Sequence, residues 1–226
     1  MMSTTLAILT IGVVSLGEIL PLLTEHIRED QITYVNLLGK LSREDVEEEY
    51  TPTSGEERII ALLNDNQLIE VSKAKIERDI QAVIEVLDNQ GFDVILLMSS
   101  APLNGLTARN AVLLEPQRVI PPLVSSIVHG HQMGVIVPVP ELLNTQRNNW
   151  LKLPTPPCYA LANPLDVSDD ELISAARQLL DDGADVLMLD SQGFHLHHLQ
   201  LLQKALGVPV LLSNALLARL TVELLM

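Results

Sequence analysis

Two serines, Ser99 and Ser191, stand at the ends of two similar stretches of the chain. The stretch Asp88-Asn-Gln-Gly-Phe-Asp-Val-Ile-Leu-Leu-Met-Ser-Ser100 recurs in altered form as Asp181-Asp-Gly-Ala-Asp-Val-Leu-Met-Leu-Asp-Ser191. A hydroxyl at the end of a buried strand can orient a ligand by hydrogen bonding. In the alternative interpretation both serines only cap the helices that follow them, a role that serine fills well. The two roles are compatible.

Two residues beside Ser191 have the chemistry of a general base. Asp190 precedes it, and His195 follows at the predicted start of a helix, where the helix N-terminus would disfavour a charged imidazole. Either residue could move a proton, and neither spacing decides between them.

Further residues at predicted strand ends are candidates for contacting a ligand. Arg109 suits a carboxylate because its planar fork matches two oxygens, and a salt bridge at the surface or between the halves is the alternative. Gly12 would let the backbone approach a ligand closely. Ser213 and Asn214 could face the same ligand or cap the last helix. The predicted ligand-binding set is Thr10, Gly12, Ser100, Arg109, Gly193, Phe194, Ser213 and Asn214.

The histidines and the one cysteine argue against a metal site. Two short histidine clusters, His195-Leu-His197-His198 and His129-Gly-His131, contain common zinc ligands. On a helix, however, the first two histidines of the longer cluster point apart and only one i, i+3 pair remains. One histidine lining the pocket is an alternative to surface or hydrogen-bonded histidines. Cys158 has no intrachain partner and no base near it in sequence, so we interpret it as a small apolar strand residue. We expect no metal ion and no cofactor.

Apolar runs predict the elements that hold these residues. Each copy of the repeat has a strand-like run upstream, Leu6–Gly12 and Met133–Pro138, and helical spacing is clearest over Ser72–Asn89. Two apolar runs around Asn64–Gln67 predict a hairpin inserted into the first half. The second half alternates strands and helices with short connections, as in a four-stranded parallel sheet.

The sequence therefore predicts an α/β fold with two pseudo-symmetric lobes, each a small parallel sheet flanked by helices. Residues 1–131 plus 214–226 would form the first lobe and residues 132–213 the second. A cleft between such lobes is expected to bind the ligand.

Composition limits the partners. The 226 residues carry a formal net charge of -15, from 14 basic and 29 acidic residues, which repels nucleic acid and anionic lipids. The segment Leu6–Leu23 is apolar, but glycine, glutamate and proline interrupt it, so we interpret it as a buried strand and a helix rather than a membrane span. We expect a cytoplasmic protein whose partner is a small-molecule carboxylate. The sequence leaves open whether identical chains assemble.

Several stretches together resemble the AroM family of bacterial proteins. They are Leu6-Ala-Ile-Leu-Thr-Ile-Gly12, Leu37-Leu-Gly-Lys-Leu-Ser-Arg-Glu44, Leu62-Leu-Asn-Asp-Asn-Gln67, Leu114-Glu-Pro116 and Val208-Pro-Val-Leu-Leu-Ser-Asn214. The resemblance covers nearly the whole chain. It links the chain by name to aromatic amino-acid biosynthesis and assigns no reaction.

A more distant resemblance is to the aspartate/glutamate/hydantoin racemase superfamily. Leu189-Asp-Ser-Gln-Gly-Phe194 is similar to the second cysteine motif of that superfamily, and Met98-Ser-Ser100 stands in the place of the first. The resemblance implies two pseudo-symmetric lobes with one catalytic cysteine from each. Serine replaces cysteine at both positions, and a hydroxyl is far less acidic than a thiol, so two-thiol racemization is not expected.

Two functions follow as hypotheses. In the first, Ser99 and Ser191 orient a small carboxylate or an aromatic-pathway metabolite, and Asp190 or His195 moves a proton in cofactor-independent isomerase, racemase or lyase chemistry. In the second, the protein binds or senses a metabolite without catalysis, which loss of both thiols favours. A mainly structural partner protein is a third alternative.

Overall fold

The computed structural model describes residues 5–14, 16, 17, 19–99, 101–191 and 193–225. The chain divides into two compact units. The first lobe comprises the residues up to 16, residues 20–117 and the residues from 221 onward, and the second lobe comprises residues 17–19 and 118–220. The units divide within α4 (Pro116–Ile127) and α8 (Ser213–Leu225), whereas the predicted boundaries lie near residues 131 and 213.

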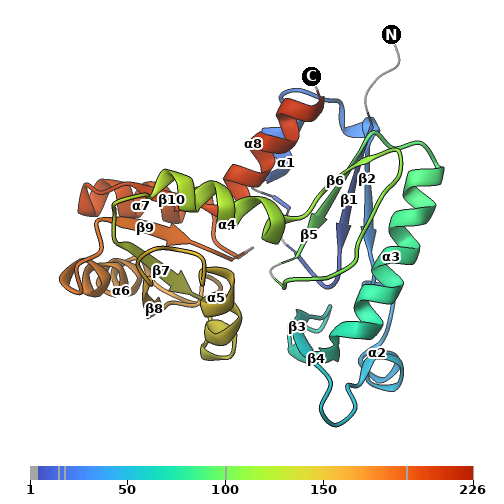
Figure 1. Ribbon diagram of the computed structural model, residues 1–226, viewed down its shortest axis with the longest axis horizontal. Helices are drawn as coiled ribbons and strands as arrows, with labels where there is room; N and C mark the ends of the chain where they lie inside the picture. The colour runs from blue at the N-terminus through green and yellow to red at the C-terminus, as the bar shows by residue number, and fades with distance from the viewer. Residues whose placement is uncertain (1–4, 15, 18, 100, 192, 226) are drawn as a thin grey trace. The chain divides into compact units, whose positions relative to one another are not determined.

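The first lobe is built on a four-stranded parallel sheet (Figure 1). Its strand order is β2-β1-β5-β6. The strands are β1 (Leu6–Thr10), β2 (Ile32–Asn36), β5 (Val94–Met98) and β6 (Val112–Leu114). β1 and β5 lie in the middle and are fully buried, as expected for parallel strands that are covered on both faces.

The second lobe repeats this arrangement. Its parallel sheet has the order β8-β7-β9-β10, so the first, second, third and fourth strands of each lobe take corresponding places. The strands are β7 (Met133–Val137), β8 (Cys158–Leu161), β9 (Val186–Leu189) and β10 (Val210–Leu212). The predicted α/β fold with two similar lobes is confirmed.

The repeat extends to individual hydrogen bonds. Asp93, directly before β5, accepts the backbone N–H of Thr5, directly before β1, at 2.8 Å through its carboxylate. Asp185, directly before β9, accepts the backbone N–H of Gln132, directly before β7, at 2.9 Å in the same way. Each aspartate thus joins the starts of the two central strands of its own lobe.

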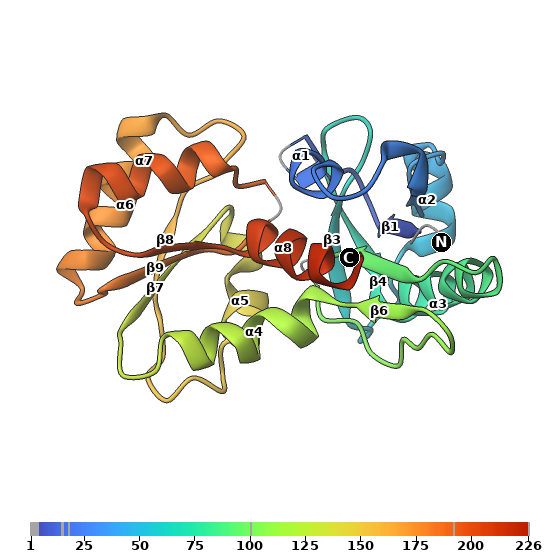
Figure 2. The same ribbon diagram turned by 90° about the horizontal axis from the view of Figure 1, so that it is seen from above.

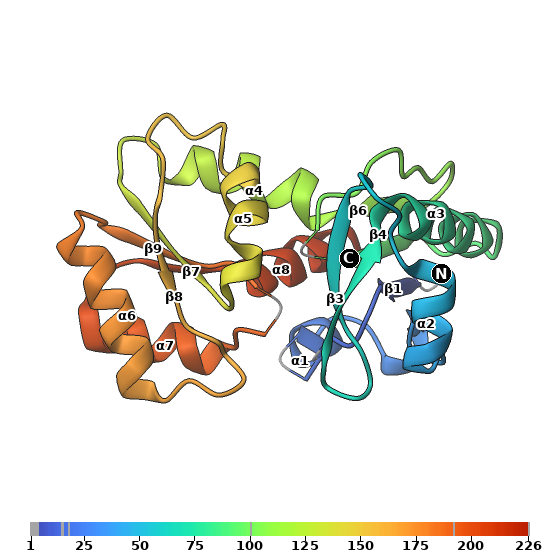
Figure 3. The same cartoon turned by 90° about the horizontal axis from the view of Figure 1, so that it is seen from below.

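Helices cover these sheets within each lobe. They are α1 (Ile19–Thr24), α2 (Arg43–Tyr50), α3 (Lys73–Asn89), α5 (Leu143–Asn149), α6 (Asp169–Asp181) and α7 (Leu196–Leu206), together with α4 and α8. Figure 2 and Figure 3 show α6 and α7 on one side of the second sheet and α5 on the other. Side chains of α6 and α7, including Leu179 and Leu202, pack on Leu187 and Leu189 of β9.

An insertion distinguishes the first lobe from the second. Between β2 and α3 it adds α2 and the antiparallel hairpin of β3 (Arg58–Leu62) and β4 (Leu68–Ser72). The hairpin lies beyond the carboxyl ends of β1 and β2 (Figure 1), and the backbone N–H of Val13 donates to the carbonyl of Leu62 at 2.7 Å. The predicted hairpin around Asn64–Gln67 is confirmed.

The apolar segment near the start of the chain folds as predicted. Leu6–Thr10 forms the buried strand β1 and Ile19–Thr24 forms α1. Among the residues that the structure describes, every helix is too short or too polar to cross a membrane.

Candidate functional site

Ser99 and Ser191 form the same local turn at corresponding strand ends. The hydroxyl of Ser99 accepts the backbone N–H of Ala101 at 3.2 Å, and the hydroxyl of Ser191 accepts that of Gly193 at 3.3 Å. A serine that bonds the backbone two residues on is a common way to start a turn. The duplicated sequence therefore produces a duplicated serine turn.

The interpretation that these serines only cap helices is wrong. Helix α7 begins at Leu196 with His195 as its N-cap, four residues after Ser191. Ser99 is followed by a loop that leads to β6 rather than by a helix. Both hydroxyls lie in loops at the carboxyl edge of a sheet, where α/β folds bind ligands.

Asp190 is a buried carboxyl group directly after β9. Because strand side chains alternate, its side chain points away from Leu189 and from the core under α6 and α7, toward the face that α5 covers. There, Gln146 Nε2 donates to the backbone carbonyl of Asp190 at 3.1 Å. The indole Nε1 of Trp150 donates to Gln146 Oε1 at 3.2 Å, which fixes the orientation of the amide.

Burial raises the pKa of Asp190 to about 6. Desolvation is the main cause because it disfavours the ionised form, while hydrogen bonds from Ser213, Gln146 and Trp150 favour that form and oppose the rise. A carboxyl group with a pKa near 6 is able both to accept and to donate a proton near neutral pH. Asp190 therefore has the property that a general acid or base needs.

Tyr159 of β8 belongs to the same environment. Burial raises the pKa of its phenol, the charge of Arg147 opposes this change, and the negative charge of Asp190 adds to it. The guanidinium carbon of Arg147 lies 5.9 Å from the centre of the Tyr159 ring. The Tyr159 phenol therefore interacts electrostatically with both Arg147 and Asp190, and it is a further polar group on this face of the sheet.

The loop after Asp190 is held by the start of α8. Asn214 Nδ2 donates to the carbonyls of Ser191 and Phe194, at 3.3 and 3.1 Å. Ser213 Oγ donates to the carbonyl of Leu189 at 3.3 Å. Phe194 has no exposed surface and packs in the core of the second lobe. Thus Asn214, Ser213 and Phe194, which the sequence predicted to bind a ligand, hold this loop in position.

The histidines at the start of α7 contact one another and a carboxylate. The backbone N–H of His195 donates to Nδ1 of His198 at 3.0 Å, and the two rings stack with centres 5.4 Å apart. His197 Nε2 lies 3.2 Å from a carboxylate oxygen of Asp169. In the described part of the chain, no group of three His, Cys, Asp or Glu residues is placed to hold a metal ion.

In the first lobe, the residues predicted to contact a ligand are Thr10, Gly12, Ser100 and Arg109, and the structure shows contacts with other parts of the protein for Gly12 and Arg109. Thr10 is buried at the end of β1. At Gly12 the close backbone approach is to the hairpin, since a Cβ there would collide with the carbonyl oxygen of Leu62. Arg109 is exposed, and its backbone N–H donates to the carboxylate of Asp88 at 3.0 Å. Ser100 lies outside the described residues.

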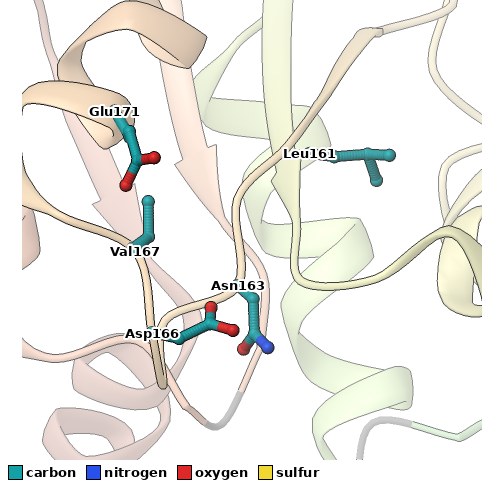
Figure 4. A pocket seen from close by; sticks show the side chains of 5 residues that line it. All are labelled: Leu161, Asn163, Asp166, Val167 and Glu171. Atoms are coloured by element: carbon teal, nitrogen blue, oxygen red, sulfur yellow. The ribbon is translucent and has the colours of Figure 1, made fainter.

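A shallow hollow of about 390 Å³ lies at the carboxyl end of β8 (Figure 4). It is lined by Leu161, Asn163, Asp166, Val167 and Glu171. In the first lobe, the corresponding connection holds the inserted α2 and hairpin. Two carboxylates in the lining oppose an anionic ligand, and Glu171 is already engaged, accepting the hydroxyl and the N–H of Ser168 at 2.7 and 2.9 Å. The lining of the hollow therefore disfavours an anionic ligand.

The sequence predicted Asp190 and Ser191 as site residues, which stays a prediction, and made no prediction for Gln146, Trp150 and Tyr159, which lie around Asp190. The only tryptophan of the chain, four residues after a glutamine on a short polar helix, was a signal that this helix turns one polar side chain inward. The cleft between the halves that the sequence predicts stays a prediction.

Solved structures with the same fold come from several enzymes. The unliganded arylmalonate decarboxylase is 11% identical, with a TM-score of 0.57 over 99% of this chain and 93% of that one. The aspartate racemase of Picrophilus torridus is 11% identical, with a TM-score of 0.57 over 99% and 94% of the two chains. The allantoin racemase of Klebsiella pneumoniae is 16% identical, with a TM-score of 0.58 over 98% and 86%. At these identities the likeness concerns the fold, which is that of the aspartate/glutamate racemases.

Sequence comparison is more specific about the family. Among curated proteins, no sequence relative is found. The family model described as AroM protein matches residues 6–225, which is nearly the whole chain. The chain therefore belongs to the AroM family.

Proposed function

We propose that the protein binds a small carboxylate or an aromatic-pathway metabolite and acts on it by cofactor-independent isomerase, racemase or lyase chemistry. The observation that carries this proposal is the buried carboxyl group of Asp190, with a pKa of about 6, next to the serine turn of Ser191. The fold supports it, because aspartate racemase and arylmalonate decarboxylase act by name on carboxylates.

Asp190 is the better candidate for the proton-transfer group. When ionised it accepts a proton from the carbon next to a carboxylate, and when protonated it returns one to that carbon. His195 is placed less well, since it forms the N-cap of α7 and its ring stacks on His198. Ser191 would orient the ligand through its hydroxyl, as would Ser99 at the corresponding turn.

Arg109 stays a predicted carboxylate clamp. The hydrogen bond to Asp88 uses the backbone N–H of Arg109, and the side chain of Arg109 is exposed. Replacing it should weaken carboxylate binding if this role is correct.

Hydrogen exchange at carbon tests the catalytic proposal. The protein is incubated in D₂O with a panel of small carboxylates, and loss of the proton signal next to the carboxylate is followed by NMR. We expect exchange with the wild-type chain, loss of exchange with Asp190→Asn, and weaker ligand binding with Ser191→Ala in calorimetry. Exchange that survives Asp190→Asn unchanged would exclude Asp190 as the proton-transfer group.

Cys158→Ser is the matched control for thiol chemistry. The thiol is half-buried on β8, and its sulfur lies 3.7 Å from the carbonyl oxygen of Asp182 and from Gln132 Nε2. We expect this variant to keep full exchange activity. Inactivation by this change would mean that the reaction takes place at Cys158 rather than at the loop of Asp190.

Metabolite binding without catalysis is the second candidate function. It is favoured by the hydroxyls at both strand ends, which donate and accept hydrogen bonds but are weak acids. A carboxylate that raises the melting temperature without any exchange at carbon in D₂O would support this function over the first.

A further inference from the structure

The loop that carries Ser191 is closed at its far end by an imidazole. His195 is the N-cap of α7 and His198 is the third residue of that helix. The backbone N–H of His195 donates to Nδ1 of His198 at 3.0 Å. The residue that accepts this N–H in a capping box is ordinarily Glu or Gln, neither of which gains a proton easily near neutral pH.

The contacts described for Ser191, Gly193 and Phe194 in this loop are made by groups that do not titrate near neutral pH. Within the loop, the backbone N–H of Gly193 donates to the hydroxyl of Ser191, and that of Phe194 donates to the Ser191 carbonyl, each at 3.3 Å. The amide of Asn214 donates to two loop carbonyls. Hydroxyl, amide and carbonyl groups keep these roles between pH 5 and pH 8, so among these contacts only the one to His198 depends on a proton.

A proton on Nδ1 of His198 would remove the acceptor. A charged imidazole has an N–H at both ring nitrogens, and so it would turn a donor toward the N–H of His195. The positive charge would also lie in the first turn of α7, where the helix dipole disfavours it. Imidazoles ordinarily gain this proton between about pH 8 and pH 5.

Charged and titratable neighbours act on His198 in both directions. The rings of His195 and His197 lie 5.4 and 5.9 Å away on its own helix and oppose a positive charge there. Asp169, in the first turn of α6, pairs with His197 at 3.2 Å and favours such a charge. The rings of Phe194 and His198 are nearly perpendicular with centres 5.6 Å apart, and α8 contributes the neutral Asn214.

We propose that His198 is a pH-responsive cap, whose protonation releases the N–H of His195 and loosens residues 193–195 before α7. The cap opens as the His198 ring gains its proton on acidification, and it closes again when that proton is lost. The consequence for ligand binding rests on the proposed function of Ser191 and Asp190, whereas the loosening itself does not.

Amide hydrogen exchange on the full chain tests this without any ligand. The exchange of the His195 amide is followed by NMR from pH 8 to pH 5 and corrected for intrinsic exchange, together with the ¹⁵N signals of the His198 ring. We expect protection of this amide to fall about fivefold to tenfold as His198 gains its proton, the size that follows from the loss of a helix cap.

Two variants of α7 sharpen the test. His198→Gln keeps an acceptor that does not titrate, so protection of the His195 amide should be independent of pH. His197→Gln changes an exposed histidine of the same helix, which pairs with Asp169, and should keep the fall.

Three results would overturn the proposal. They are protection that stays constant while the His198 ring titrates, a ring that does not titrate between pH 8 and pH 5, and an equal fall in His198→Gln. The wild-type measurement is decisive even if this variant does not fold. A failed search for a ligand or a reaction would count against the proposed function and would leave the proposal about His198 unaffected.

Discussion

Asp190→Asn should stabilise the protein at neutral pH. The pKa of Asp190 is raised by burial to about 6, against 3.8 for an ordinary aspartate. At about 1.4 kcal/mol for each pH unit between these values, holding the carboxylate ionised in the folded chain costs about 3 kcal/mol. Asparagine keeps the size of the side chain, offers an oxygen acceptor and an N–H donor as the protonated carboxyl group does, and removes this cost.

The sign of the pH dependence follows from the raised pKa. The folded state binds the proton of Asp190 more tightly than the unfolded state does, so the wild-type chain loses stability as the pH rises from about 4 to about 6. The variant lacks this loss. We expect Asp190→Asn to be more stable by about 3 kcal/mol at pH 7.5 and by less than about 1 kcal/mol at pH 4.

Urea unfolding at several pH values measures this difference. Trp150 is the only tryptophan, is buried in the second lobe, and hydrogen-bonds Gln146 beside Asp190, so its fluorescence reports on unfolding near the substitution. Asp185→Asn is a control of opposite sign, because hydrogen bonds from His131 and from the Gln132 backbone lower the pKa of that exposed carboxyl group. This control should lose stability at neutral pH, and the loss should shrink in acid.

Two results would refute the reasoning about Asp190. One is a loss of stability in Asp190→Asn at pH 7.5. The other is a gain of the same size at pH 7.5 and at pH 4, which would mean that the amide packs better for reasons unrelated to charge.

Three further substitutions test the packing of the two lobes. Gly12→Ala should cost about 1–3 kcal/mol in urea unfolding, because the added methyl group collides with the Leu62 carbonyl oxygen and the hairpin must shift; an unchanged midpoint would refute this contact. Asp88→Asn should lower the melting temperature at neutral pH, because the backbone N–H groups of Ala111 and of the two residues before it stabilise the Asp88 carboxylate. The difference in melting temperature should shrink as the pH falls through the lowered pKa of Asp88, and a pH-independent difference would count against this reasoning. Leu179→Ala should destabilise the second lobe by about 2–5 kcal/mol, since this side chain of α6 is fully buried, and a loss below about 1 kcal/mol would contradict the core described here.

The sequence predicted the framework well because local patterns decide it. Helix α3 follows from apolar residues at helical spacing, and it begins after Ser72 and ends two residues before Gly91, which has a φ of +85° that glycine tolerates. The central strands β5 and β9 are the apolar runs of the repeat. Their parallel pairing follows from the alternation of strands and helices.

Tertiary contacts explain what the sequence did not predict. Gln146 and Asp190 are far apart in the chain, and nothing in the local pattern of either residue indicates that they meet. Serine has a high capping propensity, which favoured Ser191 as a cap, but the turn from Ser191 to Phe194 delays the helix until Leu196. The close approach at Gly12 was expected to serve a ligand, and it depends on where the inserted hairpin folds back.

The aspartates before β5 and β9 bear on how a duplicated chain keeps its register. Asp93 binds the residue before β1, and Asp185 binds the residue before β7, so the contact that aligns the two central strands lies wholly within one half. Register is therefore specified separately in each half, by a carboxylate that was copied together with its strand. An insertion in one half, such as α2 and the hairpin, leaves this alignment unchanged, which lets one lobe acquire new loops while the other keeps the shorter form.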